Sequence, residues 1–149
     1  MKIHKIIAVI LACLVAISLM SCSRDPKAPI ASKIEESSHR EKQWERISET
    51  NNGTFYIDAN SIRRDGQNVT ALRLIDYHIP PEFEGKKIYS GEIFERYDCT
   101  GMVVNQMKII AYSENMAQGD VIQNFDNLNR VITIDAGTPI ERVFAYLCK

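Results

Sequence analysis

The sequence predicts an α+β domain, in which an antiparallel β-sheet of about five to six strands carries a C-terminal α-helix on one face, preceded by a signal peptide and a flexible tether. Three observations support this prediction. The chain opens with an apolar run behind two lysines, extended segments separated by turn signals fill the region after Lys42, and the residues after Gly137 repeat with the period of an amphipathic helix.

The N-terminal segment is typical of a bacterial lipoprotein signal peptide. Its apolar run, Ile6 to Met20, is short for a membrane-spanning helix of about 20 residues but suits the h-region of a secretory signal. The run leads into Leu-Met-Ser-Cys, which resembles the lipobox whose cysteine is lipidated and becomes the new N-terminus. We therefore predict a signal peptide over residues 1–21 and lipidation of Cys22. Ordinary cleavage near Ser21 and an uncleaved anchor are the alternatives.

Lipidation at Cys22 would make the membrane a partner through the N-terminus, because several buried acyl chains give a stable anchor. In many Gram-negative bacteria an aspartate directly after the lipidated cysteine favours retention in the inner membrane, and here that position is Ser23. We therefore expect a lipid-anchored protein of the cell outer membrane, on its periplasmic or surface-exposed face.

Residues 22–42 are predicted to be a flexible tether, and residues 43–149 a single globular domain. From Ser23 to Lys42 the sequence has two prolines, four serines and no aromatic residue, a composition that buries too little apolar surface to fold. A short helix beginning near Ser32 is the alternative. The net charge of −1 becomes −3 once the two lysines of the signal peptide are removed, which argues against nucleic-acid binding.

Several segments of the domain are predicted to be strands. Trp44–Glu49 fits neither the helical nor the strand period, but Asn52-Gly53 after it is a signal for a hairpin turn with positive φ, and Asp65-Gly66 is a second. Pro80-Pro81 interrupts the strand pattern, so His78–Lys87 is predicted to be an exposed loop. The expected strands are Thr54–Asn60, Val69–Ile79, Ile88–Cys99 and Met102–Glu114, with shorter extended segments at Val121–Phe125 and Val131–Ile134.

The chain ends in a predicted amphipathic helix. Thr138, Pro139 and Glu141 have the residue types of an N-cap, a first helical position and a capping-box glutamate. Four apolar side chains share one face and are expected to pack on the sheet: Ile140, Val143, Phe144 and Leu147.

The cysteine count predicts a disulfide. If Cys13 is removed with the signal peptide and Cys22 is lipidated, Cys99 and Cys148 remain, and export places them where disulfides persist. A catalytic thiolate would need a nearby histidine, and a zinc site would need four closely spaced ligands. We therefore expect Cys99 to be bonded to Cys148, with no catalytic residue, metal site or cofactor.

Other candidate groups favour structural roles. Glu92 and Glu95, three residues apart on a strand, should point to opposite faces and not act as a paired acid and base. The short basic segments Ile62–Arg64 and Gly85–Lys87 are expected to be solvated turns. Because long loops often carry function, the loop at His78–Lys87 is the preferred contact region, although Phe83 could fold back onto the core.

The order of several short motifs resembles the surface-adhesin protein E family of bacterial lipoproteins. The matching features are Trp44, then Tyr56–Asp58 with Ser61-Ile62, Asp76-Tyr77, Ser90, Asp98-Cys99, and Gly137–Pro139 leading to Cys148. The resemblance implies an antiparallel sheet with an attached C-terminal helix, a disulfide, homodimers, and binding to host matrix proteins at the cell surface.

The sequence therefore favours a non-enzymatic, adhesin-like protein-binding module on a cell-envelope lipoprotein, with a host matrix protein or an envelope component as its partner. The alternative is a periplasm-facing structural or accessory lipoprotein. A haem-binding site is the least favoured interpretation, because only His78 or a tyrosine could be the axial ligand of the haem iron.

Overall fold

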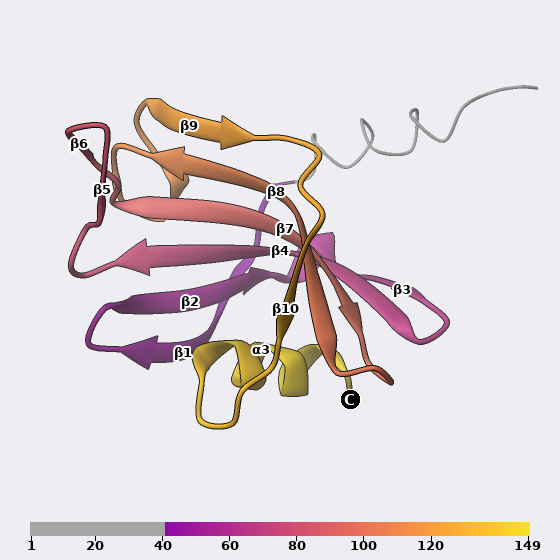
Figure 1. Cartoon of the computed structure of the whole chain (residues 1–149). Helices are drawn as coiled ribbons and strands as arrows, with labels where there is room; N and C mark the ends of the chain where they lie inside the picture. Colours follow the sequence, from indigo (N-terminus) through magenta and orange to yellow (C-terminus); the bar gives the residue numbers. More distant parts are fainter. Residues whose placement is uncertain (1–40) are drawn as a thin grey trace, which may run out of the picture. The chain divides into compact units, whose positions relative to one another are not determined.

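A computed structural model describes residues 41–149 and shows one twisted antiparallel sheet with a short helix across part of it (Figure 1). The predicted signal peptide, Cys22 and most of the predicted tether lie outside these residues. The elements, in chain order, are β1 (Trp44–Thr50), β2 (Gly53–Asp58), η1 (Ala59–Ser61), β3 (Arg63–Asp65), β4 (Asn68–Tyr77), β5 (Glu82–Phe83), β6 (Lys86–Lys87), β7 (Ser90–Asp98), β8 (Val103–Tyr112), η2 (Asn115–Ala117), β9 (Val121–Phe125), β10 (Arg130–Thr133) and α3 (Pro139–Leu147).

The sheet confirms the predicted fold class, but the predicted strand number was too low. Eight strands form it, in the order β1-β2-β4-β7-β8-β10, with β3 also paired to β4 and β9 to β8. Strands β5 and β6 make a separate two-stranded hairpin. The two strands beyond the six expected are β1 and β3. Strand β3, like β5 and β6, is only two or three residues long, which is too short for a period of two to be recognised.

The turn predicted at Asn52-Gly53 is wrong in its geometry, because neither residue has a positive φ. The turn lies one residue earlier, at Asn51-Asn52, and Gly53 is the first residue of β2. A Cβ atom on Gly53 would lie 2.6 Å from the backbone oxygen of Asp76, so glycine is required there by the close approach of β4. The second predicted hairpin is present, but its turn lies one residue later than predicted, at Gly66-Gln67; Gly66 has φ +57° and Asp65 is the last residue of β3.

A β-bulge explains why the first strand has no clear sequence period. Arg46 pairs with Tyr56 and Ser48 pairs with Phe55, which leaves Ile47 as an extra residue in β1. The bulge moves the following side chains to the other face of the sheet. In a regular strand Trp44 and Ile47, three positions apart, would point to opposite faces of the sheet. The bulge at Ile47 interrupts this alternation.

The core lies between the sheet and α3, on what we call the helix face. Residues from four strands meet Val143, Phe144 and Leu147 of the helix there; the strand residues are Ile57, Val69, Ala71, Tyr97 and Val104. The helix begins as predicted, with the Thr138 hydroxyl accepting a hydrogen bond from the amide of Glu141 at 3.3 Å and Pro139 in the first turn. Among residues 41–149, none of the helices has the length and apolar character required to cross a membrane.

A disulfide closes the core at the end of the helix. Cys99, directly after β7, is bonded to Cys148, directly after α3, with a Cα–Cα distance of 5.4 Å and a sequence separation of 49. These are the two cysteines that the sequence analysis predicts to pair. The helix is thus fixed at its start by a capping threonine and at its end by a covalent bond.

Replacing both cysteines, as Cys99→Ser with Cys148→Ser, should lower the free energy of unfolding by about 4 kcal/mol, the chain-entropy value for a loop of this length. Urea unfolding followed by the fluorescence of Trp44, the single tryptophan, measures this change. Reduced wild-type protein should behave like the double variant. Equal stabilities of oxidised wild type and double variant would contradict a stabilising bond.

Candidate binding surface

Three connections lie together at one end of the sheet, which we call the loop end (Figure 1, left). They are the β1–β2 turn, the segment 78–89 between β4 and β7, and the β8–β9 loop, residues 113–120. Backbone hydrogen bonds join them to one another and to the strand ends, since the amide of His78 donates to Asn52 at 2.9 Å and that of Tyr89 to Tyr112 at 3.0 Å. The loop end is therefore a continuous surface built from distant parts of the sequence.

The β8–β9 loop is held by two side chains from central strands. One carboxylate oxygen of Asp76, in β4, accepts from the amide of Met116 at 2.7 Å and from the side-chain amide of Asn115 at 3.1 Å. The fully buried Ser90, in β7, donates its hydroxyl to the carbonyl of Glu114 at 2.5 Å and accepts from the amide of Ala117 at 2.9 Å. These four bonds fix the loop to the sheet beneath it.

The backbone of this loop is strained. Met116 and Ala117 have φ values of 56° and 59°, in the left-handed region. A non-glycine residue in such a conformation costs about 1–3 kcal/mol and persists only where its surroundings impose it. Asp76 and Ser90 supply that constraint. The conformation of the β8–β9 loop is thus fixed by the domain itself, without a binding partner.

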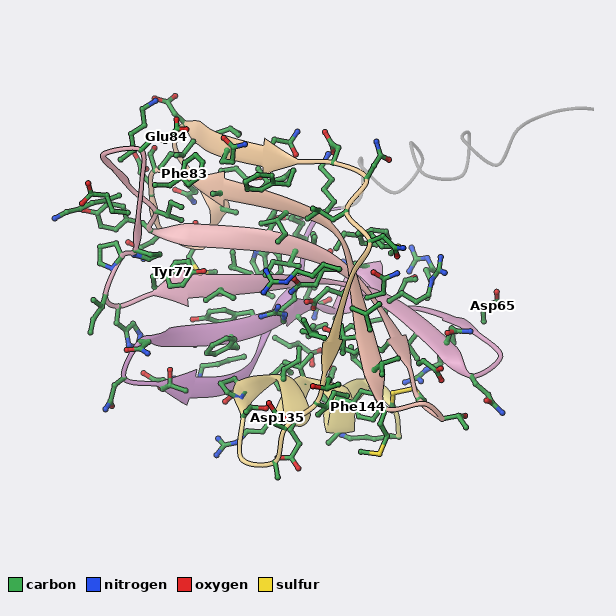
Figure 2. The ribbon with its side chains drawn as sticks, viewed as in Figure 1. Asp65, Tyr77, Phe83, Glu84, Asp135 and Phe144 are labelled. Atoms are coloured by element: carbon green, nitrogen blue, oxygen red, sulfur yellow. A yellow bond between two sulfur atoms is a disulfide. The ribbon has the colours of Figure 1, made fainter. Side chains whose placement is uncertain are left out.

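The segment 78–89 contains a small hairpin that turns back toward β9. Glu84 and Gly85, between β5 and β6, both have positive φ, as a two-residue type I′ turn requires. The ring of Phe83 contacts that of Phe125, in β9, edge to face at 6.3 Å. Phe125 is 40% exposed and outside the core cluster, so Phe83 folds back onto the edge of the sheet and not, as expected, onto the core. Figure 2 shows Tyr77, Phe83 and Glu84 at the loop end and Asp65 at the other end of the sheet.

The two short basic segments do not meet. Arg63 and Arg64 lie exposed in β3, while Lys86 and Lys87 lie exposed in β6, at opposite ends of the sheet (Figure 1). Each pair is thus a local feature of its own hairpin.

The other candidates from the sequence are dispersed. His78 is exposed, with its Nε2 atom 3.1 Å from the hydroxyl of Thr54 and 3.9 Å from a carboxylate oxygen of Glu49. Within residues 41–149, no three His, Cys, Asp or Glu side chains are grouped as ligands for a metal ion.

Glu92 and Glu95 contact different sets of residues, one on each face of the sheet. Glu92 accepts from Lys42 and from the hydroxyl of Tyr112. Glu95 belongs to a cluster on the helix face. Both carboxylates are buried, which the strand pattern alone did not indicate.

The cluster around Glu95 is a fully hydrogen-bonded network in the centre of the sheet. Arg73 donates to both carboxylate oxygens of Glu95 at 2.7 Å, and Tyr97 and Gln106 donate to them at 2.5 Å and 3.0 Å. A bulge in β8 makes the contact with Gln106 possible. Phe94 pairs with Lys108 and Glu95 with Gln106, so Met107 is the extra residue and Gln106 shifts to the helix face.

The protonation states in this cluster follow from burial and charge together. Burial alone would raise the pKa of Glu95, but the adjacent Arg73 guanidinium and the three hydrogen-bond donors lower that pKa below its ordinary value. Burial would lower the pKa of Arg73, yet the Glu95 carboxylate raises it above its usual range. Burial and the negative charge of Glu95 raise the pKa of Tyr97 well above its ordinary value. The cluster therefore holds a salt bridge and a neutral phenol at any physiological pH.

The chain enters the domain at the end opposite the loop end. The backbone oxygen of Glu41 accepts from the side-chain amide of Asn60, in η1, at 2.8 Å, and the amide of Gln43 donates to Asp58 at 2.8 Å. Lys42 then reaches Glu92 on the face opposite the helix. The first described residues are thus fixed to the sheet just before β1 begins.

Comparison with known proteins identifies the family. The sequence model of the surface-adhesin protein E family matches residues 44–149 of this chain. The chain belongs to the surface-adhesin protein E family. This places it among adhesin-like surface proteins that bind other proteins.

Solved structures of Haemophilus influenzae protein E share the fold of this family member. One matches at 18% identity with a TM-score of 0.54, over 73% of this chain and 86% of its own. A second crystal form matches at 18% identity with a TM-score of 0.56, over 73% of this chain and 89% of its own. The protein from non-typeable H. influenzae matches at 17% identity with a TM-score of 0.54, over 74% of this chain and 78% of its own. No curated protein sequence matches significantly.

Several polar side chains in the family-like motifs are hydrogen-bonded to the backbone of turns and loops. Asp58 accepts from the amides of Gln43 and Asn60, and Asp98 accepts from those of Thr100 and Gly101. Asp76 and Ser90 hold the β8–β9 loop. These motif residues therefore stabilise the turns around Asp58 and Asp98 and the shape of the loop end.

Glu95→Gln should lower the free energy of unfolding by about 3–5 kcal/mol at neutral pH, because it leaves Arg73 buried without a countercharge. Since the folded pKa of Glu95 is lowered, its stabilisation is complete above the unfolded value near 4.3 and is lost as the pH falls through the folded pKa. The cost of the substitution should therefore shrink in acid. Urea unfolding between pH 2.5 and 7 measures it.

Glu82→Gln is the matched control, because Glu82 is exposed in β5. It should change stability by less than about 0.5 kcal/mol at every pH. Equal stability and equal pH dependence of the two variants would contradict the role assigned to Glu95.

Proposed function

We propose that the chain is a bacterial lipoprotein whose signal peptide, residues 1–21, is removed and whose Cys22 is lipidated. In this proposal residues 22–42 are the tether, and residues 43–149 are a non-enzymatic adhesin-like module on the outer face of the outer membrane. The loop end binds a host matrix protein. Membership of the surface-adhesin protein E family supports the adhesin-like role.

The point at which the chain enters the domain supports placing the binding surface at the loop end. Glu41 and Gln43 contact η1 and the end of β2, so a tether would reach the domain at that end. Strand β2 begins at the loop end with Gly53 and finishes at η1. A membrane anchor at the N-terminus would therefore leave the loop end as the part of the domain farthest from the tether along the strands.

The loop end also has a suitable mixture of side chains. Ile79, in the segment 78–89, is 65% exposed, and the hairpin beside it exposes two acidic and two basic residues, Glu82, Glu84, Lys86 and Lys87. An exposed apolar residue with charged neighbours is typical of protein interfaces, whose polar rims surround a small apolar centre. The fixed backbone beneath reduces the ordering cost of binding.

Anchoring and orientation are tested together in intact cells. Wild-type protein should stay with the cells and be removed by an external protease, because both the anchor and the outward face are part of the proposal. Cys22→Ala should release the protein from the membrane fraction. Immunoblots of shaved cells, washed membranes and periplasmic extract measure these outcomes, with a periplasmic protein as the control for intact envelopes.

Protection of wild-type protein from the protease would overturn the surface assignment and favour a periplasm-facing accessory lipoprotein. An unchanged membrane fraction for Cys22→Ala would contradict lipidation. The two results are independent, so anchor and orientation are judged separately.

The loop end is tested with a matched pair of surface substitutions. Ile79→Ser should lower the capture of host matrix proteins by cells at least fivefold, because it removes the most exposed large apolar side chain of that surface. Met102→Ser is the control, since Met102 is similarly exposed, at 57% against 65% for Ile79, but lies in the β7–β8 turn at the other end of the sheet. Pull-down of soluble matrix proteins by cells with equal surface amounts measures the difference.

Equal capture by both variants and wild type would rule out the loop end as the contact surface. Loss of capture by Met102→Ser alone would move the proposed surface to the disulfide end of the domain.

A further inference from the structure

A hollow in the loop end has the chemistry of a ligand site that the adhesin role does not require. Its volume is about 430 Å³, and its lining is Tyr89, Ser113, Glu114, Asn115 and Gln118. The hollow is shallow and largely open to solvent, and its volume falls near the lower end of the range of small-molecule sites, about 300–1,000 Å³. The lining comes from two segments, since Tyr89 precedes β7 and the other four residues belong to the β8–β9 loop.

The lining can donate and accept several hydrogen bonds at once. Asn115 and Gln118 each carry an amide donor and a carbonyl acceptor, Ser113 and Tyr89 carry hydroxyls, and Glu114 carries a carboxylate acceptor. Within the described part of the chain, no side-chain hydrogen bond engages Tyr89, Glu114 or Gln118. These three groups are therefore available to a ligand.

Other groups in the lining are already used to build the loop. The hydroxyl of Ser113 accepts from the amide of Asp120 at 2.8 Å, and the side-chain amide of Asn115 donates to Asp76. The carbonyl oxygen of the Asn115 side chain is left as an acceptor. In the lining, the hydrogen-bonded side chains of Ser113 and Asn115 hold the loop, and the neighbouring polar groups of Tyr89, Glu114 and Gln118 are available to a ligand.

The combination of an aromatic ring with planar polar groups points to one class of ligand. A saccharide offers adjacent hydroxyls, each both donor and acceptor, which suit amides and a carboxylate. It also offers a face of C–H groups that can lie against an aromatic ring, as weak polarised contacts with a π-system do. An anionic ligand is disfavoured by Glu114, because like charges repel at short range.

We propose that this hollow binds a neutral saccharide, with Tyr89 beneath the sugar ring and Glu114 and Gln118 bonded to its hydroxyls. The strained backbone at Met116 and Ala117, held by Asp76 and Ser90, fixes these groups before the sugar binds. A preformed site reduces the ordering cost that would otherwise weaken binding. The proposal stands apart from the protein-binding function, since either can hold without the other.

The test uses the full-length chain in lauryldimethylamine oxide, because a maltoside detergent would itself supply a sugar. Immobilised neutral glycans ending in glucose, galactose, mannose, N-acetylglucosamine or N-acetylgalactosamine are the probes, with sialylated and sulfated glycans beside them. At least one neutral terminus should bind. Tyr89→Leu and Glu114→Gln should each weaken that binding at least tenfold, whereas Arg64→Ala, exposed in β3 at the other end, should leave it unchanged.

A positioning test separates contact from support. Asp76→Asn removes the charge that holds the β8–β9 loop without removing a lining side chain, and it should weaken sugar binding about three- to tenfold while thermal unfolding stays cooperative. NMR spectra of wild-type protein titrated with the binding sugar should shift the amide signals of residues 113–118. Binding that survives Tyr89→Leu and Glu114→Gln, binding of charged glycans alone, or no binding to any neutral glycan would overturn the proposal.

Discussion

The fold depends on covering one face of the sheet with a helix of nine residues. Isolated helices shorter than about 12–15 residues are marginal in water, so α3 depends on packing its apolar face against the sheet, and fixing its two ends stabilises it further. The Thr138 cap and the Cys99–Cys148 bond provide this. Val143, Phe144 and Leu147 shield the apolar side chains of four strands from water. The apolar face of the helix and its two fixed ends together maintain the two-layer arrangement.

The buried Arg73–Glu95 pair supports the same arrangement by favouring one register. A shift of one residue between β4 and β7 would turn either partner toward the opposite face, where the other charge could not be matched. The β8 bulge at Met107 has a similar effect, because it brings Gln106 to Glu95. Such a pair adds little stability compared with apolar packing, and its benefit is to make wrong pairings costly.

The sequence predicted those features that depend on local patterns or on simple counts. The helix was predicted from Thr138, Pro139 and its apolar face, and the long strands from their composition. What it did not reveal depends on contacts between distant segments. The bulge at Ile47 disguised β1, the role of Gly53 follows from its distance to Asp76, and the polar partners of Glu95 lie on three strands. The hollow beside Tyr89 likewise requires two loops to meet, which no local pattern in either could indicate.

The path by which the chain enters the sheet has a mechanical consequence. Strand β1 starts beside η1 and runs toward the loop end, paired along its length with β2. A pull between an N-terminal tether and something held at the loop end would act along the strands. Such a force slides β1 past β2 and loads their hydrogen bonds together, whereas a force across the strands would break them one after another. The attachment of the chain therefore suits a domain that carries tension.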